Sequence, residues 1–311
     1  MSEKIAFLFP GQGSQYPGMG GDLAHSFAPA AEALAAAEGA LGVRLTRLMR
    51  EGSAEALTAT EVAQPAILAH SVAVYRVLDR AGVKPSWVAG HSLGEYSALA
   101  AAGGLPFPDA LRLVRDRGLA MAAAGADVPG VMAAILGLDD EAVEAAVAEA
   151  GEVGTVVVAN YNSPGQVVIS GEPEAVARAG HLAKEAGARG VMPLKVSGAF
   201  HSPLMASAAE RMRPLLAAAP IADIRVPLIS NVDAEPRQDA AGLRAALERQ
   251  VTGSVLWTAS IRRLVAEGAQ IFVEVGPGDV LTRLMKRIAP EAEALATSNA
   301  AGVEAVLARF A

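Results

Sequence analysis

The amino-acid sequence predicts an α/β protein in which a small subdomain is inserted into a larger one. Three observations lead to this prediction. Strand-like apolar segments alternate with helix-like segments along most of the chain. Residues 129–196 follow the order βαββαβ, which is typical of a ferredoxin-like subdomain. Strand-like segments resume after this insert, so residues 1–128 and 197–311 are expected to form the large subdomain together.

The N-terminal third supplies the first elements of the large subdomain. Segment 4–9, KIAFLF, is expected to form a buried strand that ends in the turn PGQG. Helical periodicity predicts helices over 28–38 and 64–81. A short apolar strand over 86–90 then leads into a helix over 95–102.

The middle of the chain has a different order of strands and helices, and this order defines the insert. Its elements are expected to be strand 131–136, helix 139–150, strands 156–160 and 166–170, helix 172–186 and strand 189–195. After the insert, strands over 229–232 and 271–275 are expected to rejoin the sheet that begins at the N-terminus. The large subdomain is therefore expected to be discontinuous in sequence.

Composition narrows the function classes. Of 311 residues, 52% are hydrophobic and 19% are charged, which excludes a disordered chain. No apolar run approaches the roughly 20 residues that span a bilayer. The apolar stretch 5–9 is also too short for the hydrophobic part of a signal peptide. We therefore expect a cytoplasmic protein that does not bind membranes.

Cysteine content and charge exclude further classes. Because the chain has no cysteine, disulfides, a thiolate nucleophile and Cys-ligated metals are excluded. The five histidines show no metal-ligand spacing, so no metal site is expected. The net charge of -7 argues against non-specific binding of nucleic acid.

The stretch GHSLGEYSA, residues 90–98, predicts a nucleophilic serine. Its pattern Gly90-x-Ser92-x-Gly94 fits a nucleophile elbow, a strained turn between a strand and a helix that exposes the serine hydroxyl. So short a pattern also arises by chance, but here it lies between a predicted strand and a predicted helix. Ser92 is thus the candidate nucleophile, with water or another group as the acyl acceptor.

A serine nucleophile needs a general base, and a histidine is the usual one. His91 is on an extended segment beside Ser92, so its side chain is expected to point the opposite way. His201 lies in SGAFHSPLM, a loop bounded by Gly and Pro where the insert returns to the large subdomain, and is the best candidate. His70 is expected to be a core or interface residue of an apolar helix. His181 is expected to be solvated on the helix of the insert, and His25 lies in a polar turn.

No aspartate can be assigned as the third member of a catalytic triad. Asp223, Asp233 and Asp239 all follow His201 in the sequence, whereas the acid precedes the histidine in hydrolases with a serine elbow. A backbone carbonyl or a side-chain amide is the alternative support for the imidazole ring.

Two other clusters are candidates for the site. The turn FPGQGSQ, residues 9–15, either supplies a backbone N–H to an oxyanion hole, together with the Leu93 N–H, or is an ordinary glycine-rich turn. Arg115 and Arg117 come from an otherwise apolar helix. Each either pairs with an internal acid or recognises a carboxylate with two hydrogen bonds.

Six motifs follow one another along the chain: FPGQGSQYPGMG near the start, GHSLGEYSAL at the elbow, RG-x-x-M from Arg117, NYNSPGQVVISG over 160–171, AFHSPLM over 199–205 and VEVGPGDVL over 273–281. Together they resemble the malonyl-CoA:acyl carrier protein transacylase family, which includes the acyltransferase domains of fatty acid and polyketide synthases. The resemblance covers essentially the whole chain. It implies an α/β-hydrolase-like large subdomain with an inserted ferredoxin-like small subdomain, in agreement with the boundaries above.

The resemblance also implies a catalytic pair and an oxyanion hole. Ser92 would carry the acyl group as an ester, and His201 would be the general base and acid. The backbone N–H groups of Gln12 and Leu93 would form the oxyanion hole.

Substrate contacts are implied in the same way. Arg117 would bind the malonyl carboxylate, and a main-chain carbonyl near Gln250 would orient the histidine. Asn160 and Asn162 fall in a motif that lines the cleft in the family. Phe200, beside the histidine, goes with malonyl rather than methylmalonyl in this family, and Leu93 also suits malonyl. The predicted steric preference is worth about 1 to 3 kcal/mol.

The implied activity is ping-pong transfer of malonyl from malonyl-CoA to holo acyl carrier protein in type II fatty acid synthesis, by a monomer without a cofactor. Alternatives are an acyltransferase that serves a polyketide synthase, a serine esterase or thioesterase, and a non-catalytic module that binds carrier proteins. Carrier proteins are acidic, so a basic patch is expected at the mouth of the cleft. The candidates for this patch are Arg189, Lys195, Arg262, Arg263, Lys286 and Arg287.

Overall fold

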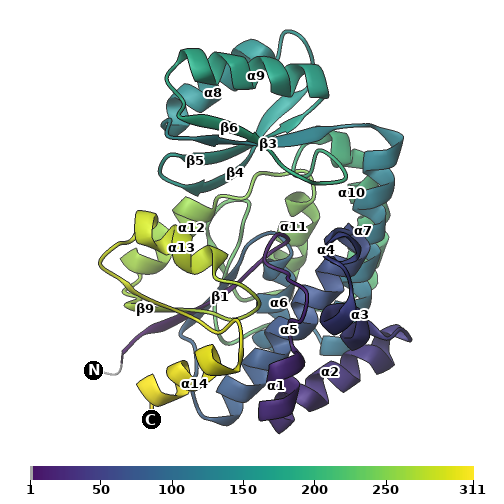
Figure 1. Cartoon of the computed structure of the whole chain (residues 1–311), viewed down its shortest axis with the longest axis vertical. Coiled ribbons are helices and arrows are strands. Elements are labelled where there is room, and N and C mark those ends of the chain that lie inside the picture. The colour runs from purple at the N-terminus through teal and green to yellow at the C-terminus, as the bar shows by residue number, and fades with distance from the viewer. Residues whose placement is uncertain (1–2) are drawn as a thin grey trace.

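The computed structural model describes residues 3–311, which form two sheets flanked by helices (Figure 1). The larger sheet has the strand order β10 (Glu293–Ala296), β9 (Ile271–Glu274), β1 (Ile5–Phe9), β2 (Trp87–Gly90), β7 (Leu228–Ile229) and β8 (Pro236–Arg237). The smaller sheet has the order β4 (Val156–Ser163), β5 (Gln166–Gly171), β3 (Val131–Leu136) and β6 (Gly190–Pro193). The first and last parts of the chain thus share one sheet.

Strand β1 lies at the centre of the larger sheet and divides its core in two. It pairs in parallel with β2, Phe7 facing Val88, and with β9, Phe7 facing Val273. Because side chains alternate along a strand, Phe7 packs into the larger apolar cluster, whereas Leu8 packs into a second cluster on the other face. The sheet is therefore covered on both faces, as is usual for parallel strands.

Helices from distant parts of the chain form these two layers. Buried side chains of the Phe7 cluster come from α1 (Gly21–Ser26), α2 (Ala28–Leu41), α3 (Leu45–Glu51), α5 (Thr60–Arg80), α6 (Gly94–Ala101), α7 (Phe107–Asp127), α10 (Ala206–Ala218), α11 (Ala240–Gln250) and α14 (Ala300–Arg309). Those of the Leu8 cluster come from α12 (Trp257–Ala266) and α13 (Val280–Ile288). Two short helical segments, α4 (Ala54–Thr58) and η1 (Pro203–Met205), lie in connecting regions.

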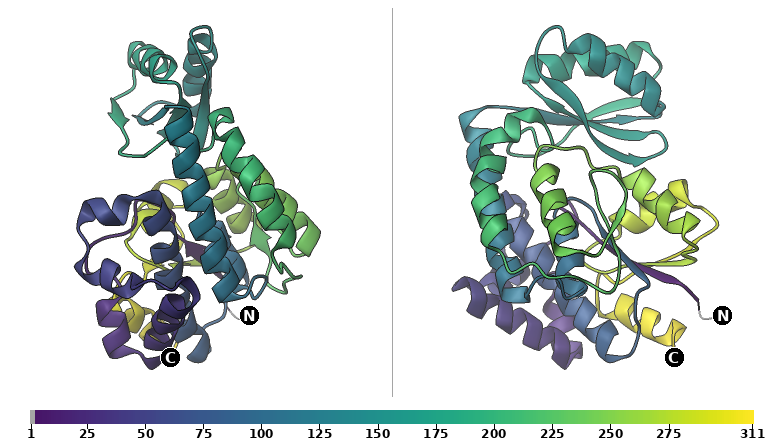
Figure 2. Two further views of the ribbon diagram at one scale, coloured as in Figure 1. Left: turned by 90° about the vertical axis from the view of Figure 1, so that its right-hand side faces the viewer. Right: turned by 180° about the vertical axis from the view of Figure 1, so that it is seen from behind.

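The smaller sheet is antiparallel and has helices on one face. Ile135 and Ile169 pack there against α8 (Asp140–Ala150) and α9 (Pro173–Glu185). On the other face, Met132 and Val168 join the core of the large subdomain. Figures 1 and 2 show this unit at one end of the molecule with α8 and α9 outermost. The predicted ferredoxin-like βαββαβ order is confirmed.

One predicted strand is shorter than expected. Only Leu228–Ile229 of the region around 229–232 pairs with β2. From Ser230 the chain turns, and the Ala234 N–H donates to the Ser230 carbonyl at 3.0 Å. The turn frees the Asn231 side chain from the sheet.

Within residues 3–311, no helix combines the length and the apolar character needed to cross a membrane.

Candidate active site

The carboxyl end of β2 forms a tight elbow that presents Ser92. Ser92 has a φ of 52°, in the left-handed region that is rare for residues other than glycine. The flanking glycines make the turn possible: a Cβ on Gly90 would lie 1.9 Å from the Gly94 carbonyl carbon, and one on Gly94 would lie 2.0 Å from the Phe9 carbonyl oxygen. Such local strain commonly accompanies functional residues.

Asn231 holds the elbow from a neighbouring loop. Its Oδ1 accepts from the Ser92 N–H at 2.7 Å, and its Nδ2 donates to the Gly90 carbonyl at 2.6 Å. Sequence reasoning missed this residue. Its one signal was its position directly after β7, at the same edge of the sheet as the end of β2.

His201 lies beside Ser92 in the arrangement of a nucleophile and its base. Its Nε2 is 2.8 Å from Ser92 Oγ, and its Nδ1 is 3.0 Å from each of the carbonyl oxygens of Gln250 and Gly253. Carbonyls can only accept, so Nδ1 bears the proton and Nε2 is free to accept one from the serine. His201 is 3% exposed and, like Ser92, has a positive φ, at 58°.

The His201 ring is neutral at physiological pH. Burial, reinforced by the positive charge of Arg117 and by His91, lowers its pKa to about 3, although the two carbonyl contacts oppose this shift. The base is therefore already in its proton-accepting form in the free protein.

The three candidate aspartates have other partners. Asp233 forms ion pairs with Arg237 and Arg249. Asp239 caps α11 through the Gly242 N–H, and Asp223 accepts from the Ala240 N–H. Two main-chain carbonyls therefore take the place that an acid has in a triad.

The prediction for His91 is wrong in one respect. Its side chain lines the same cavity as Ser92, and its Nε2 is 2.8 Å from Asn162 Oδ1. The predicted alternation requires extended backbone, and the left-handed conformation of Ser92 breaks it. The other three histidines lie elsewhere: His70 is fully buried, His25 is exposed in α1, and His181 pairs with Glu185 on α9.

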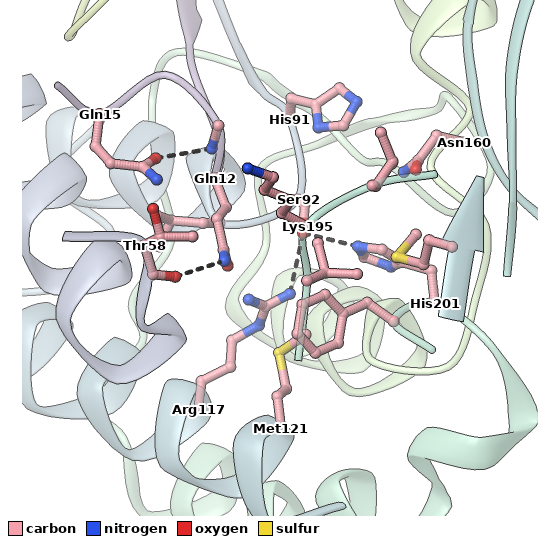
Figure 3. Close-up of a pocket in the computed structure, with 16 residues that line it drawn as sticks. Gln12, Gln15, Thr58, His91, Ser92, Arg117, Met121, Asn160, Lys195 and His201 are labelled. Carbon is pink, nitrogen blue, oxygen red and sulfur yellow. Dashed lines mark hydrogen bonds between the residues drawn. The ribbon is translucent and has the colours of Figure 1, made fainter. Parts of the chain in front are cut away.

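Arg117 comes from α7 and approaches Ser92 from another direction than His201 does (Figure 3). One terminal nitrogen, Nη1, donates to Gln64 Oε1 at 2.9 Å, while Nη2 donates to Gln250 Oε1 at 2.9 Å and to Ser92 Oγ at 3.2 Å. The guanidinium is 1% exposed, and within the described chain no carboxylate lies within ion-pair distance of it. Arg115 points elsewhere and donates to the Leu41 carbonyl.

These groups line a cavity of about 260 Å³ between the two subdomains. Ser92, Leu93 and Arg117 line it from the large subdomain, and Met132 and Asn160 line it from the small one. Further walls are formed by Gln12, Gln15, Thr58, Met121, Phe200 and the link Leu194, Lys195 and Val196. The cavity is therefore lined by a serine, a base, a buried cation and several apolar side chains.

The backbone around the cavity offers two free donors. Neither the Gln12 N–H nor the Leu93 N–H donates to any acceptor within residues 3–311. The Gln12 side chain is tied down separately, because its Nε2 donates to Thr60 Oγ1 at 3.3 Å. Both residues line the cavity, which is the placement that an oxyanion hole requires.

The two asparagines of β4 do not share one position. Asn160 lines the cavity, whereas Asn162 is not among its walls and contacts His91 instead. Asn162 therefore reaches the cavity only through His91, and a contact between Asn162 and substrate stays a prediction. Asn162 lies two residues further along the strand, roughly 7 Å away, which carries it past the cavity.

Phe200 lines the cavity and is 6% exposed.

Gln250 lies beneath the cavity rather than in its wall. It is fully buried, its main chain supports His201, and its side chain bonds Arg117 and the Ser92 carbonyl. The Gln250 carbonyl therefore lies where it can orient His201, as the resemblance implied, and the residue supports three groups that line the cavity. Gln64 and Glu95, which sequence reasoning missed, are buried beside it.

Comparisons with known proteins find relatives along nearly the whole chain. Residues 6–304 match a family model described as the acyl transferase domain. The chain is 46% identical over 302 residues to the "Malonyl CoA-acyl carrier protein transacylase" of Bacillus subtilis, an alignment that covers 97% of this chain and 95% of that protein.

Solved structures are equally similar. The crystal structure of an acyl carrier protein S-malonyltransferase from Vibrio cholerae has a TM-score of 0.94 and 44% identity, covering 98% of this chain and 100% of that one. A malonyl-transacylase in complex with its type II PKS acyl-carrier protein has a TM-score of 0.95 and 43% identity, covering 99% and 100%.

Proposed function

The chain belongs to the acyl transferase family, and we propose that it transfers malonyl from malonyl-CoA to the phosphopantetheine thiol of a holo acyl carrier protein through an ester on Ser92. The observation that carries the proposal is the buried guanidinium of Arg117, whose Nη2 lies 3.2 Å from Ser92 Oγ. Two glutamine side-chain oxygens accept from this guanidinium, but it has no carboxylate partner in the described structure. A carboxylate at the far end of a short acyl group would satisfy this cation.

The contacts support a two-step mechanism. His201 Nε2 takes the proton from Ser92 Oγ as the oxygen attacks the thioester carbonyl, and the N–H groups of Gln12 and Leu93 stabilise the oxyanion. The C–S bond then breaks, and His201 returns the proton to the departing CoA sulfur. In the second step His201 takes the proton of the carrier thiol, whose sulfur attacks the malonyl ester carbonyl. The ester C–O bond then breaks, and His201 returns the proton to Ser92 Oγ. The kinetics are therefore ping-pong.

Arg117 also supports transfer rather than hydrolysis. By gripping the malonyl carboxylate it fixes the ester carbonyl relative to Ser92, so that an acceptor must arrive along one direction. Met132 and Phe200 in the walls limit the room for water around the ester. The same grip disfavours acetyl-CoA, which has no carboxylate to pair with the guanidinium.

Further parts of the proposal follow from the site. Phe200 crowds the position of an additional methyl group, which favours malonyl over methylmalonyl by about 1 to 3 kcal/mol.

Serine and histidine supply the nucleophile and the proton transfers, so the reaction uses no cofactor. One chain provides the whole site, in keeping with a monomer, and we place the enzyme in cytoplasmic type II fatty acid synthesis. The complex with a type II PKS carrier protein favours polyketide synthesis as the second candidate pathway.

Intact-mass spectrometry tests the proposal directly. We expect malonyl-CoA to give a covalent malonyl adduct that holo carrier protein then removes and acquires. Ser92→Ala should form no adduct, because it lacks the nucleophile. Release of free malonate without loading of the carrier would contradict transfer and favour a thioesterase.

Reversing one charge at the cavity mouth is expected to weaken binding of the carrier protein. Of the six basic candidates, Lys195 lines the cavity and is exposed, whereas Arg263 is engaged with Glu235 and Glu267. Lys195→Glu should raise the KM for the acidic carrier protein about tenfold at low salt, because it replaces attraction by repulsion. Initial rates at varied carrier and salt concentrations measure the effect.

Arg80→Glu is the matched control for this charge reversal. Arg80 is exposed at the end of α5, just before β2, and so lies at the amino-terminal edge of the parallel sheet, opposite the elbow. The Arg80→Glu variant should leave the KM for the carrier protein unchanged. An equal increase in both variants would indicate a general charge effect and would exclude Lys195 as a docking residue.

A further inference from the structure

We propose that Glu95 is a positioning residue that aims Arg117 at the carboxylate of the substrate, acting through the side-chain amide of Gln250. This inference rests on the proposed function and adds to it a residue that touches neither the cavity nor the reacting atoms. Glu95 lies in the first turn of α6, three residues after the nucleophile, and is 1% exposed.

The presence of Glu95 calls for a physical reason. A buried carboxylate is costly unless it is well paired, and no Lys or Arg lies within ion-pair distance of Glu95 in residues 3–311. Burial raises its pKa to about 7, although the Gln250 amide and the Asn231 N–H oppose the shift. An unfolded glutamic acid loses its proton near 4.5. Stability is therefore lost as pH rises from there toward 7, so Glu95 does not favour folding at neutral pH.

The contacts of Gln250 define what Glu95 does. Gln250 Nε2 donates to Glu95 Oε2 at 2.6 Å and to the Ser92 carbonyl at 2.9 Å, while Gln250 Oε1 accepts from Arg117 Nη2 at 2.9 Å. Glu95 Oε2 accepts from Gln250 Nε2 and from the Asn231 N–H, and with any proton on Oε1 it accepts in the acid as it does in the carboxylate. The Ser92 carbonyl also requires a donor, and the guanidinium requires an acceptor. A flipped amide would place its NH₂ against the guanidinium and its oxygen against two acceptors. Glu95 therefore fixes which end of the amide faces Arg117.

The fixed amide in turn orients the guanidinium. Two glutamine oxygens hold it, Gln64 Oε1 at Nη1 and Gln250 Oε1 at Nη2. The Gln64 amide nitrogen has a weak partner, the sulfur of Met121 at 3.6 Å, so its orientation is less constrained. The chain of contacts from Glu95 through Gln250 is thus the stronger of the two supports. It leaves Nη2 directed toward Ser92 Oγ, beside which the malonyl group must lie.

Glu95→Gln tests the inference with almost no change in volume. The new amide presents either an oxygen or an NH₂ to Gln250, so the Gln250 orientation is no longer enforced. We expect the KM for malonyl-CoA to rise about tenfold and the ratio of kcat/KM for malonyl-CoA over acetyl-CoA to fall about tenfold. Sulfonylation of Ser92 by a neutral sulfonyl fluoride, which has no carboxylate, should change much less.

Glu274→Gln is the matched control. Glu274 is also a buried glutamate, 1% exposed, but its oxygens accept from the Leu281 and Thr282 N–H groups at the start of α13, away from the cavity. Its loss should lower the Tm and leave the malonyl over acetyl ratio unchanged. The comparison separates loss of a buried carboxylate from loss of the contact with Gln250.

A double variant shows whether Glu95 acts through Arg117. With Arg117→Ala already present, Glu95→Gln should cause no further loss of the malonyl over acetyl ratio. If Glu95→Gln does not fold, Gln250→Met interrupts the same contacts while keeping the main-chain carbonyl of residue 250, and the same fall in the ratio is expected. An unchanged ratio in the folded single variant, or an additive loss in the double variant, would overturn the inference.

These outcomes are separate from those that concern the proposed function. Wild-type enzyme that forms no malonyl adduct would contradict the proposed function whatever Glu95 does. Wild-type enzyme that transfers malonyl, together with an unchanged ratio in Glu95→Gln, would contradict the role of Glu95 alone.

Discussion

Replacing His201 by Asn is expected to lower the rate of Ser92 acylation by malonyl-CoA about 10⁴-fold while the chain stays folded. Asparagine tolerates the left-handed backbone found at this position, where φ is 58°. Its amide NH₂ can donate to the Gln250 and Gly253 carbonyls, as the ring Nδ1 does now. What the variant lacks is a basic atom 2.8 Å from Ser92 Oγ.

The rate is measured by following the malonyl adduct with time by mass spectrometry. His70→Asn is the control, because His70 is also a fully buried histidine whose pKa is lowered by burial, to about 4, but it lies outside the cavity. It is expected to cost stability and to leave acylation of the folded protein near the wild-type rate. Acylation of His201→Asn within tenfold of wild type would contradict the role of base.

The wild-type enzyme gives a second measure of the same group through pH. Since the pKa of His201 is lowered to about 3, its neutral form persists from pH 8 down to pH 5 and is lost as pH falls through 3. Modification of Ser92 by a neutral sulfonyl fluoride should therefore show no decline centred near 6.5, the ordinary histidine value. A tenfold fall by about pH 5.5 would show that the imidazole titrates normally.

The fold was predictable because the sequence expresses it locally. The apolar strand around Phe7, the alternation in the insert and the turns between elements each reflect their own short segments. The strand expected over 229–232 failed for a non-local reason: Asn231 is taken out of the sheet to bind the backbone on both sides of Ser92. A contact with a residue 139 positions away has no periodicity to reveal it.

The candidate site was predictable to a different depth at different residues. Ser92 stands out because a strained motif is visible in sequence. The charges of Arg115 and Arg117 in an apolar helix are visible too, but only the resemblance singled out Arg117. Gln64 and Glu95 are not visible in this way, since each looks like a polar residue of an ordinary helix until folding buries it. The difference between Asn160 and Asn162 likewise depends on where the cavity ends along β4.

Loss of the guanidinium is expected to change which substrate the enzyme accepts. Arg117→Ala should lower kcat/KM for malonyl-CoA by about 100- to 1,000-fold, because a buried, charge-assisted contact worth roughly 3 to 4 kcal/mol is lost. Acetyl-CoA makes no such contact, so its kcat/KM should change by less than about tenfold. Steady-state rates with both donors measure the ratio.

Arg115→Ala is the control that distinguishes recognition from the loss of an arginine in α7. Arg115 lies two residues earlier on the same helix, and its Nη1 donates to the Leu41 carbonyl, away from the cavity. Its removal should cost stability without changing the malonyl over acetyl ratio. If both variants lost malonyl activity equally, or if Arg117→Ala kept the wild-type ratio, the guanidinium would be a structural group. A collapse of the ratio confined to Arg117→Ala would instead show that its unpaired buried charge serves the carboxylate of the substrate.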